Sequence, residues 1–145
     1  MYVDPRGPRF AAAVTTVVLA VVLLLAGTVI GTALLAAQAV VFALGATRGP
    51  QASPYGRAFK RLIRPRLAPP AELEDVRPLK FAQSVGLGFA LVGLLGFVTG
   101  ATILGVVAVA FALAAAFLNA AFGYCLGCEM YLLIRRVAPA RASVS

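Results

Sequence analysis

The chain has 145 residues, of which 61% are hydrophobic and 12% are charged, whereas soluble domains average about 45–50% apolar and about 25% charged residues. A water-soluble fold of this length could not bury so much apolar surface, so the composition excludes an ordinary soluble domain and predicts a membrane protein. The net charge of +8 does not indicate a nucleic-acid partner, because the basic residues flank apolar segments, as they do in membrane proteins.

The first apolar segment, residues 11–47, carries no charge and is too long for one membrane crossing. As a single helix it would extend roughly 55 Å at about 1.5 Å per residue, against a hydrocarbon core of about 30 Å. Glycine and β-branched residues at 27–31 weaken helix propensity. We therefore predict two spanning helices, near residues 11–26 and 30–46, with a reversal between them. A secretory leader is the competing interpretation of the N-terminus, but the apolar run continues past the core of a leader without a convincing cleavage site.

A short amphipathic segment follows the second predicted span. Apolar residues recur there at i, i+4, i+7 and i+8, namely Tyr55, Phe59, Leu62 and Ile63, with basic residues between them. This spacing predicts a short helix that lies on the inner membrane surface and turns its basic face toward anionic headgroups. Residues 67–78 are rich in proline and acidic residues, which predicts an extended linker.

The second uncharged segment, residues 81–128, repeats this arrangement. We predict spans near residues 81–98 and 101–119, with a reversal at the glycines of 96–100, and then a second short basic helix that begins near Glu129. The apolar stripe of this helix consists of Met130, Leu133, Ile134 and Val137. Both reversals contain G-x-x-x-G spacing, which fits a turn, close helix packing or chance equally well.

All the basic residues lie outside the predicted spans. None of the 13 lysines and arginines lies in an uncharged segment, and neither hairpin tip carries a charge. By the positive-inside rule, both termini and the central loop face the cytoplasm, in a multi-pass protein of the inner (plasma) membrane. The predicted membrane-surface basic face, which would meet an anionic inner leaflet, consists of Arg57, Lys60, Arg61, Arg64, Arg135 and Arg136.

The chain also partly matches itself when it is shifted by 71 residues. The matches that lie outside apolar runs are Asp4 with Asp75, Arg6 with Arg77, Arg9 with Lys80, Gly56 with Gly127, and residues 62–64 with 133–135. We interpret them as two copies of one unit. Each copy crosses the membrane an even number of times, so the copies would be parallel repeats related by an axis along the membrane normal.

We therefore predict an all-α membrane protein with four transmembrane helices. They form two tandem parallel-repeat hairpins, each followed by a short amphipathic interfacial helix. The first repeat covers residues 1–66, the linker covers 67–78 and the second repeat covers 79–145, and together they make one membrane domain. This arrangement also allows a homo-oligomer.

One motif offers chemistry, the C-x-x-C sequence that joins Cys125 to Cys128. The repeat register places it just past the fourth span, at the cytoplasmic surface and at the opening of the second basic helix. Backbone N–H groups and the helix dipole would stabilise a thiolate there, and the spacing allows a disulfide to form and reopen. Cys125 is the predicted attacking thiol and Cys128 the resolving thiol, in a pair that cytoplasmic reductants keep reduced at rest.

Two alternatives remain for these cysteines. If the fourth span continues through Cys128, both are buried packing residues without reactivity, and two chains could also share a four-thiolate metal site. Within one chain we predict no metal and no cofactor, because the sequence has no histidine, no paired carboxylates and no nucleotide fingerprint. We expect Gln38 and Asn119 to bond between helices, and Asn119 is close enough to Cys125 to help line a pocket.

Four short motifs carry a family resemblance: Asp4-x-Arg6-x-x-Arg9-Phe10, Ser53-Pro54-Tyr55, Arg64-Pro65-Arg66 and, above all, Gly123-Tyr124-Cys125-Leu126-Gly127-Cys128-Glu129-Met130-Tyr131. They look like the domain-of-unknown-function family 4395, a family of small bacterial, mostly actinobacterial, integral membrane proteins. The resemblance covers nearly the whole chain. Members are often encoded near thioredoxin-like and sulfurtransferase genes, which implies a link to thiol or sulfur chemistry.

The leading functional hypothesis is a cytoplasm-facing membrane dithiol that takes part in thiol–disulfide exchange or sulfur transfer, with a thioredoxin-like or sulfurtransferase protein as its partner. The alternative is a non-catalytic membrane scaffold that docks partners through its basic cytoplasmic face and has structural cysteines. A weaker hypothesis is a permeation path for a neutral or sulfur-containing solute, which a wet cavity between the hairpins would favour. Whether the chain is an enzyme is left open.

Overall fold

The computed structural model describes residues 2–3, 6–49, 54–63, 74–122 and 125–137. Apart from two very short strands, all of its regular elements are helices. In chain order they are β1 (Tyr2–Val3), α1 (Arg6–Leu24), α2 (Val29–Arg48), α3 (Pro54–Ala58), the π-helical turn η2 (Phe59–Ile63), β2 (Glu74–Asp75), α4 (Val76–Thr99), α5 (Thr102–Phe122) and α6 (Leu126–Val137).

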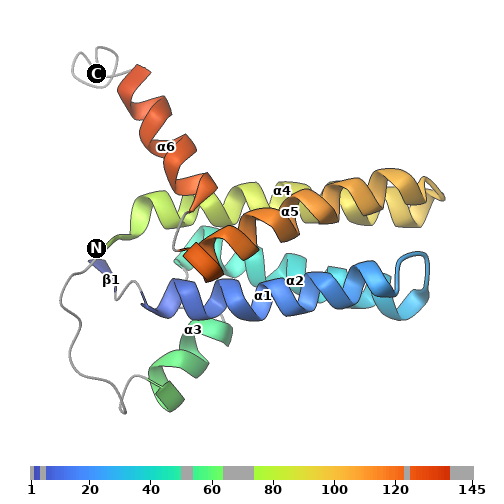
Figure 1. Ribbon diagram of the computed structural model, residues 1–145, viewed down its shortest axis with the longest axis horizontal. Coiled ribbons are helices and arrows are strands. Elements are labelled where there is room, and N and C mark those ends of the chain that lie inside the picture. Colours follow the sequence, from blue (N-terminus) through green and yellow to red (C-terminus); the bar gives the residue numbers. More distant parts are fainter. Residues whose placement is uncertain (1, 4–5, 50–53, 64–73, 123–124, 138–145) are drawn as a thin grey trace.

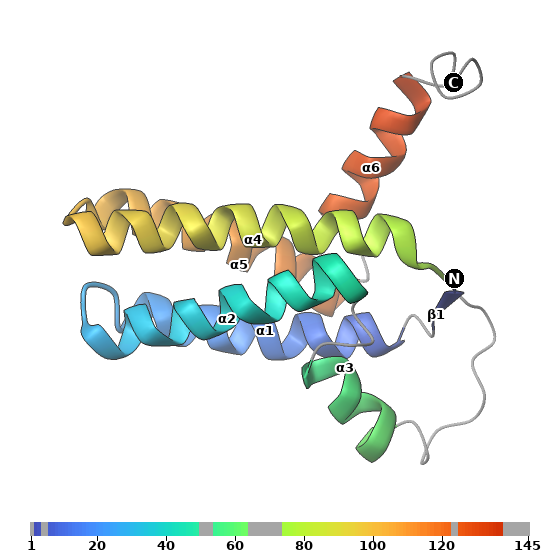
Figure 2. The same ribbon diagram turned by 180° about the vertical axis from the view of Figure 1, so that it is seen from behind.

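The long helices α1, α2, α4 and α5 lie side by side as a bundle (Figures 1 and 2). Both hairpin reversals lie at one end of this bundle. The β1 strand, α3 and α6 lie at the opposite end, where α3 and α6 diverge from the bundle axis in different directions. All the described basic residues belong to this second end, because the uncharged segments make up the rest of the bundle.

Four of the described helices are long and apolar enough to cross a membrane: α1, α2, the part of α4 from Arg77 to Thr99, and α5. Their outward faces carry large apolar side chains, and Leu24, Val29 and Ile103 are among the most exposed. Such a surface is stable in lipid and would be costly in water. The protein is therefore a multi-pass membrane protein. The helices α1 and α4 begin before their predicted spans, among the basic residues that precede the uncharged segments, and α2 and α5 end two and three residues after theirs.

Helices of different hairpins form the principal packing of the bundle, with α2 against α4 and α1 against α5. The core brings together buried side chains from all four long helices: Leu19, Val22, Leu35, Ala39, Phe42, Ala90, Val109 and Ala112. The two hairpins therefore share one hydrophobic core.

At each reversal, one glycine of the G-x-x-x-G pair forms the turn and the other allows close packing. Gly27 and Gly100 have φ of 83° and 87°, a left-handed conformation that favours glycine, and they form the turns. Gly31 and Gly96 serve close packing instead: a Cβ on Gly31 would collide with the carbonyl of Leu25, and one on Gly96 would lie 2.5 Å from the backbone nitrogen of Gly105. Both predicted reversals are confirmed.

The short basic helix after α2 differs from the prediction. It is not one regular helix, because α3 changes into the π-helical turn η2 at Phe59. Phe59 is only 5% exposed; its ring lies 5.9 Å from that of Phe10 and packs against Gly7 of α1. Part of the apolar stripe therefore meets protein, whereas the sequence predicted contact with lipid. Leu62 is exposed as the prediction requires.

The end of the predicted linker is ordered. Tyr2 pairs with Asp75 and Val3 with Glu74 in an antiparallel ladder between β1 and β2, and α4 begins directly afterwards at Val76. Residues 67–73 lie outside the described part of the chain. The two strands join the segments that lead into α1 and α4, which brings the starts of the two hairpins together.

Candidate functional site

Cys125 and Cys128 form a disulfide, with their Cα atoms 5.2 Å apart. The fourth span does not continue through them, since α5 ends at Phe122 and α6 begins at Leu126. The predicted helix start near Glu129 is therefore three residues too late, and Cys128 lies in the first turn of α6. Both cysteines are half-buried, so neither is sealed inside a continuous membrane-spanning helix.

Cys125 caps the N-terminus of α6. The backbone N–H of Cys128 donates a hydrogen bond of 3.2 Å to the Cys125 Sγ, and the backbone N–H of Glu129 donates to the Cys125 carbonyl. The first N–H groups of a helix have no partners within it and carry the positive end of the dipole. The sulfur of Cys125 thus occupies the position of a conventional capping oxygen, where negative charge is favoured.

Two contacts hold α6 against the start of α4. A Cβ on Gly127 would lie 2.6 Å from both Cα and Cβ of Ala82, so only glycine permits this approach. One turn further along α6, the ring of Tyr131 lies 5.8 Å from that of Phe81. These contacts place the disulfide over the end of the bundle, although none of the residues of α6 is fully buried.

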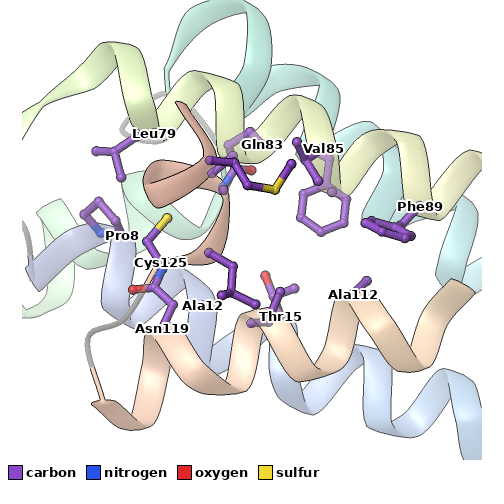
Figure 3. Close-up of a pocket in the computed structure, with 18 of the residues that line it drawn as sticks. Pro8, Ala12, Thr15, Leu79, Gln83, Val85, Phe89, Ala112, Asn119 and Cys125 are labelled. Carbon is purple, nitrogen blue, oxygen red and sulfur yellow. The ribbon is translucent and has the colours of Figure 1, made fainter. Parts of the chain in front are cut away.

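A cavity of about 240 Å³ lies beneath the disulfide, between α1, α4, α5 and the beginning of α6 (Figure 3). Cys125 lines it and Cys128 does not. Figure 3 shows Cys125 and Asn119 next to each other at one end of the cavity, and Phe89 and Ala112 at the other. The expectation that Asn119 shares a pocket with Cys125 is confirmed. The walls of the cavity are mainly apolar.

Three polar side chains interrupt these apolar walls, and they come from three different helices: Thr15 from α1, Gln83 from α4 and Asn119 from α5. Within the described residues, no hydrogen bond engages any of the three side chains. The sequence predicted an interhelical bond for Asn119, which the described residues do not form, and it assigned no role to Thr15 or Gln83. Their convergence depends on how the helices pack, which no pattern within a single helix reveals.

A second polar contact fixes α3 to the bundle. The Tyr55 hydroxyl donates a hydrogen bond of 2.7 Å to Oε1 of Gln38, which is 1% exposed. The predicted interhelical bond of Gln38 is thereby confirmed. Burial raises the pKa of Tyr55, so its hydroxyl stays protonated and able to donate to a higher pH than that of a free tyrosine. No described group bonds to Nε2 of Gln38.

The predicted basic face is distributed over both short helices. Arg57, Lys60 and Arg61 are exposed on α3 and η2. Arg135 and Arg136 are exposed on α6. Arg64 lies outside the described residues. These side chains occupy the same end of the bundle as the disulfide, where α3 and α6 diverge (Figure 1). Arg9 also lies there, and its Nη2 donates to the carbonyl of Ala120 near the end of α5 at 3.3 Å.

The fold and the site define a small multi-pass membrane protein that carries a disulfide at one end of its helical bundle. The chain belongs to the family described as "Domain of unknown function (DUF4395)", whose model matches residues 3–136. The resemblance expected from the sequence motifs is thus confirmed. No curated protein and no solved structure matches the chain.

Proposed function

We propose that the protein is a membrane-bound dithiol carrier, in which the Cys125–Cys128 pair exchanges electrons or sulfane sulfur with a soluble thioredoxin-like or sulfurtransferase protein. The observation that carries this proposal is the half-buried disulfide at the N-terminus of α6, where the Cys125 sulfur accepts the N–H of Cys128. A sulfur in this position is a good leaving group, because the helix terminus stabilises its thiolate.

The exchange reaction follows from this asymmetry. A partner thiolate attacks the Sγ of Cys125, a mixed disulfide forms, and Cys128 leaves as a thiolate. A second partner thiolate then attacks the partner's sulfur and releases the Cys125 thiolate, which the cap stabilises. The partner is oxidised to a disulfide by two electrons, and the pair is reduced to a dithiol. The reverse sequence uses Cys125 as the nucleophile and Cys128 as the resolving thiol.

The orientation belongs to the same proposal. The basic residues and the disulfide share one end of the bundle, and the positive-inside rule assigns that end to the cytoplasm. Both termini would then be cytoplasmic, and the membrane-surface basic face would lie against an anionic inner leaflet, with each basic residue near the surface contributing about 1 kcal/mol to that attraction.

We also infer that the two halves are parallel repeats. The strand pairing supports this, because Val3 pairs with Glu74, its equivalent in the shift of 71 residues. The neighbouring pair, Tyr2 with Asp75, takes one residue before Val3 and one residue after Glu74, as a two-fold axis through the Val3–Glu74 pair requires. Helix packing supports it as well, because α1 against α5 and α4 against α2 are equivalent contacts in that register. An axis between the halves would produce both relations.

Thiol labelling tests the function and the orientation together. Inverted membrane vesicles are treated with a membrane-impermeant maleimide, with and without a reductant. The structure holds the pair as a disulfide, whereas the sequence predicted a pair that is reduced at rest, so we expect labelling of inverted vesicles only after reduction. We expect no labelling in sealed right-side-out vesicles until they are opened. Labelling of sealed right-side-out vesicles would reverse the orientation. A pair that stays unlabelled after reduction in every vesicle type would be inert, and the scaffold alternative would replace the carrier.

A further inference from the structure

We propose that the cavity beside Cys125 binds the ring of a membrane quinone, which re-oxidises the reduced Cys125–Cys128 pair. This inference rests on the proposed dithiol function, because it supplies the electron acceptor that such a cycle requires. The acceptor must reach a sulfur that faces an apolar cavity among spanning helices, and a lipid-soluble two-electron acceptor meets that condition.

The size and walls of the cavity fit a ring. A closed apolar cavity of about 150 Å³ holds one benzene molecule, so a cavity of about 240 Å³ has room for a substituted or bicyclic ring. Phe42 and Phe89 offer it aromatic contacts. Phe111 also lines the cavity and is 61% exposed on the lipid-facing side of α5, so a ring with a long isoprenoid tail could enter from the bilayer and leave its tail there.

The polar groups distinguish a quinone from a lipid acyl chain. An acyl chain would leave the side chains of Thr15, Gln83 and Asn119 without hydrogen bonds in an apolar site, which is costly. A quinone has two carbonyl acceptors on opposite sides of its ring. The two amides and the hydroxyl supply donors from three different helices (Figure 3), so both carbonyl groups can be satisfied at once.

In the first half of the chain, a buried aromatic ring fills the place that corresponds to the cavity. Phe59, which is 5% exposed, fills the contact between the first short helix and α1. The shift of 71 residues aligns Phe59 with Met130, which is 47% exposed and lines the cavity. A flexible thioether adapts to different occupants. The cavity therefore arises where the second half carries a movable side chain in place of a buried ring.

The reaction balances with these groups alone. The Cys125 thiolate adds to a ring carbon of the quinone and forms a C–S bond. The Cys128 thiolate then attacks the Cys125 sulfur, the S–S bond forms, the C–S bond breaks, and its electron pair enters the ring. The two protons released by the thiols end on the ring oxygens. The dithiol loses two electrons and the quinone becomes a hydroquinone, with Cys125 at the cavity and Cys128 outside it.

The test uses the full chain in lipid nanodiscs, reduced, freed of reductant and kept anaerobic. Duroquinone is the probe, because its ring is fully substituted and does not retain stray thiol adducts. We expect one hydroquinone per chain and recovery of the disulfide. Ala115→Phe, which fills the cavity from α5, should slow the reaction at least tenfold. Ala114→Phe, which adds the same ring to the adjacent exposed position outside the cavity, should not slow it.

Equal rates in the two phenylalanine variants would overturn the proposal. If Ala115→Phe does not fold, Gln83→Leu and Asn119→Leu replace it. A single-turnover rate that depends on duroquinone concentration as in the wild type, in both variants, would overturn the proposal equally. Thioredoxin exchange is measured on the same preparations. A chain that exchanges with thioredoxin but does not reduce duroquinone refutes the quinone site and leaves the dithiol carrier intact, whereas a chain that does neither refutes both.

Discussion

The two short helical segments that follow the hairpins occupy equivalent places but have different environments. The first, α3 with η2, is anchored by the Tyr55–Gln38 hydrogen bond and by the buried ring of Phe59. The second, α6, has no fully buried residue and is held against α4 by the close approach of Gly127 to Ala82 and by the ring contact of Tyr131 with Phe81. One segment completes the packing of the bundle, whereas the other leaves the Cys125–Cys128 disulfide above a cavity.

This difference indicates where a site can form if the two halves are repeats, as we propose. A segment that contributes a buried aromatic ring is rigid and has no space beside it. A segment held by one glycine contact and one half-exposed ring contact can retain a cavity, because little of its side-chain surface is buried in the core. The four predictions below test this contrast.

The largest effect should come from the disulfide itself. In Cys125→Ser and Cys128→Ser we expect thiol exchange with thioredoxin to fall by more than about 100-fold, because the two-electron exchange starts from the disulfide that the two sulfurs form together. Unfolding in detergent should change little, since the loop closed by the bond is very short. Ser84→Ala, on an exposed position of α4, is the control. Undiminished exchange in either cysteine variant would show that the disulfide at the start of α6 does not carry out the exchange.

Truncating the two equivalent apolar side chains should give unequal costs. Phe59→Ala removes a buried ring and is expected to lower the free energy of unfolding by about 3–5 kcal/mol. Met130→Ala removes a half-exposed side chain beside an existing cavity and should cost less than about 1 kcal/mol. Chemical unfolding in a fixed detergent measures both. Similar costs would mean that the two segments are packed alike.

The glycine contact of α6 should also be sensitive. In Gly127→Ala the new Cβ would meet Ala82 at 2.6 Å, and overpacking of this kind costs about 1–3 kcal/mol. Gly88→Ala on α4 is the matched control, because nothing lies within 4 Å of its Cβ position and alanine favours a helix. Thermal unfolding compares them. If both variants melt together, the close approach of α6 to α4 does not contribute to stability.

The smallest expected effect concerns the anchor of the first segment. Tyr55→Phe removes the hydrogen bond to Gln38 and should cost about 1 kcal/mol. Burial raises the folded-state pKa of Tyr55 above its ordinary value of 10.0, so its contribution is complete below about pH 10 and is lost as the pH rises through the folded-state pKa. The difference in unfolding free energy between wild type and Tyr55→Phe should therefore be smaller above pH 10 than at pH 7. A gap that widens with pH would contradict this assignment.

The helices could be predicted from the sequence because their causes are local. Uncharged stretches define the spans, and the glycines at 27 and 100 define the turns. The position of Asn119 beside Cys125 followed from their short separation in the chain. The π-helical turn at Phe59 could not be predicted, because it depends on the contact of that ring with Gly7 and Phe10 of another helix.

The start of α6 and the cavity could not be predicted from the sequence either. The helix begins at Leu126 because the sulfur of Cys125 acts as its cap, whereas sequence patterns associate caps with oxygen-bearing side chains. The cavity requires three helices to converge with their polar residues facing one another, and that arrangement is a property of tertiary packing.

The ladder between Tyr2–Val3 and Glu74–Asp75 has a mechanical consequence. It fastens the beginnings of the two hairpins to each other through backbone atoms, independently of the peptide chain that runs between the halves. Together with the shared core, it allows the two halves to associate without a covalent connection. Two fragments expressed separately, each with its own hairpin, should then reassemble in the bilayer and co-purify through a tag on one of them.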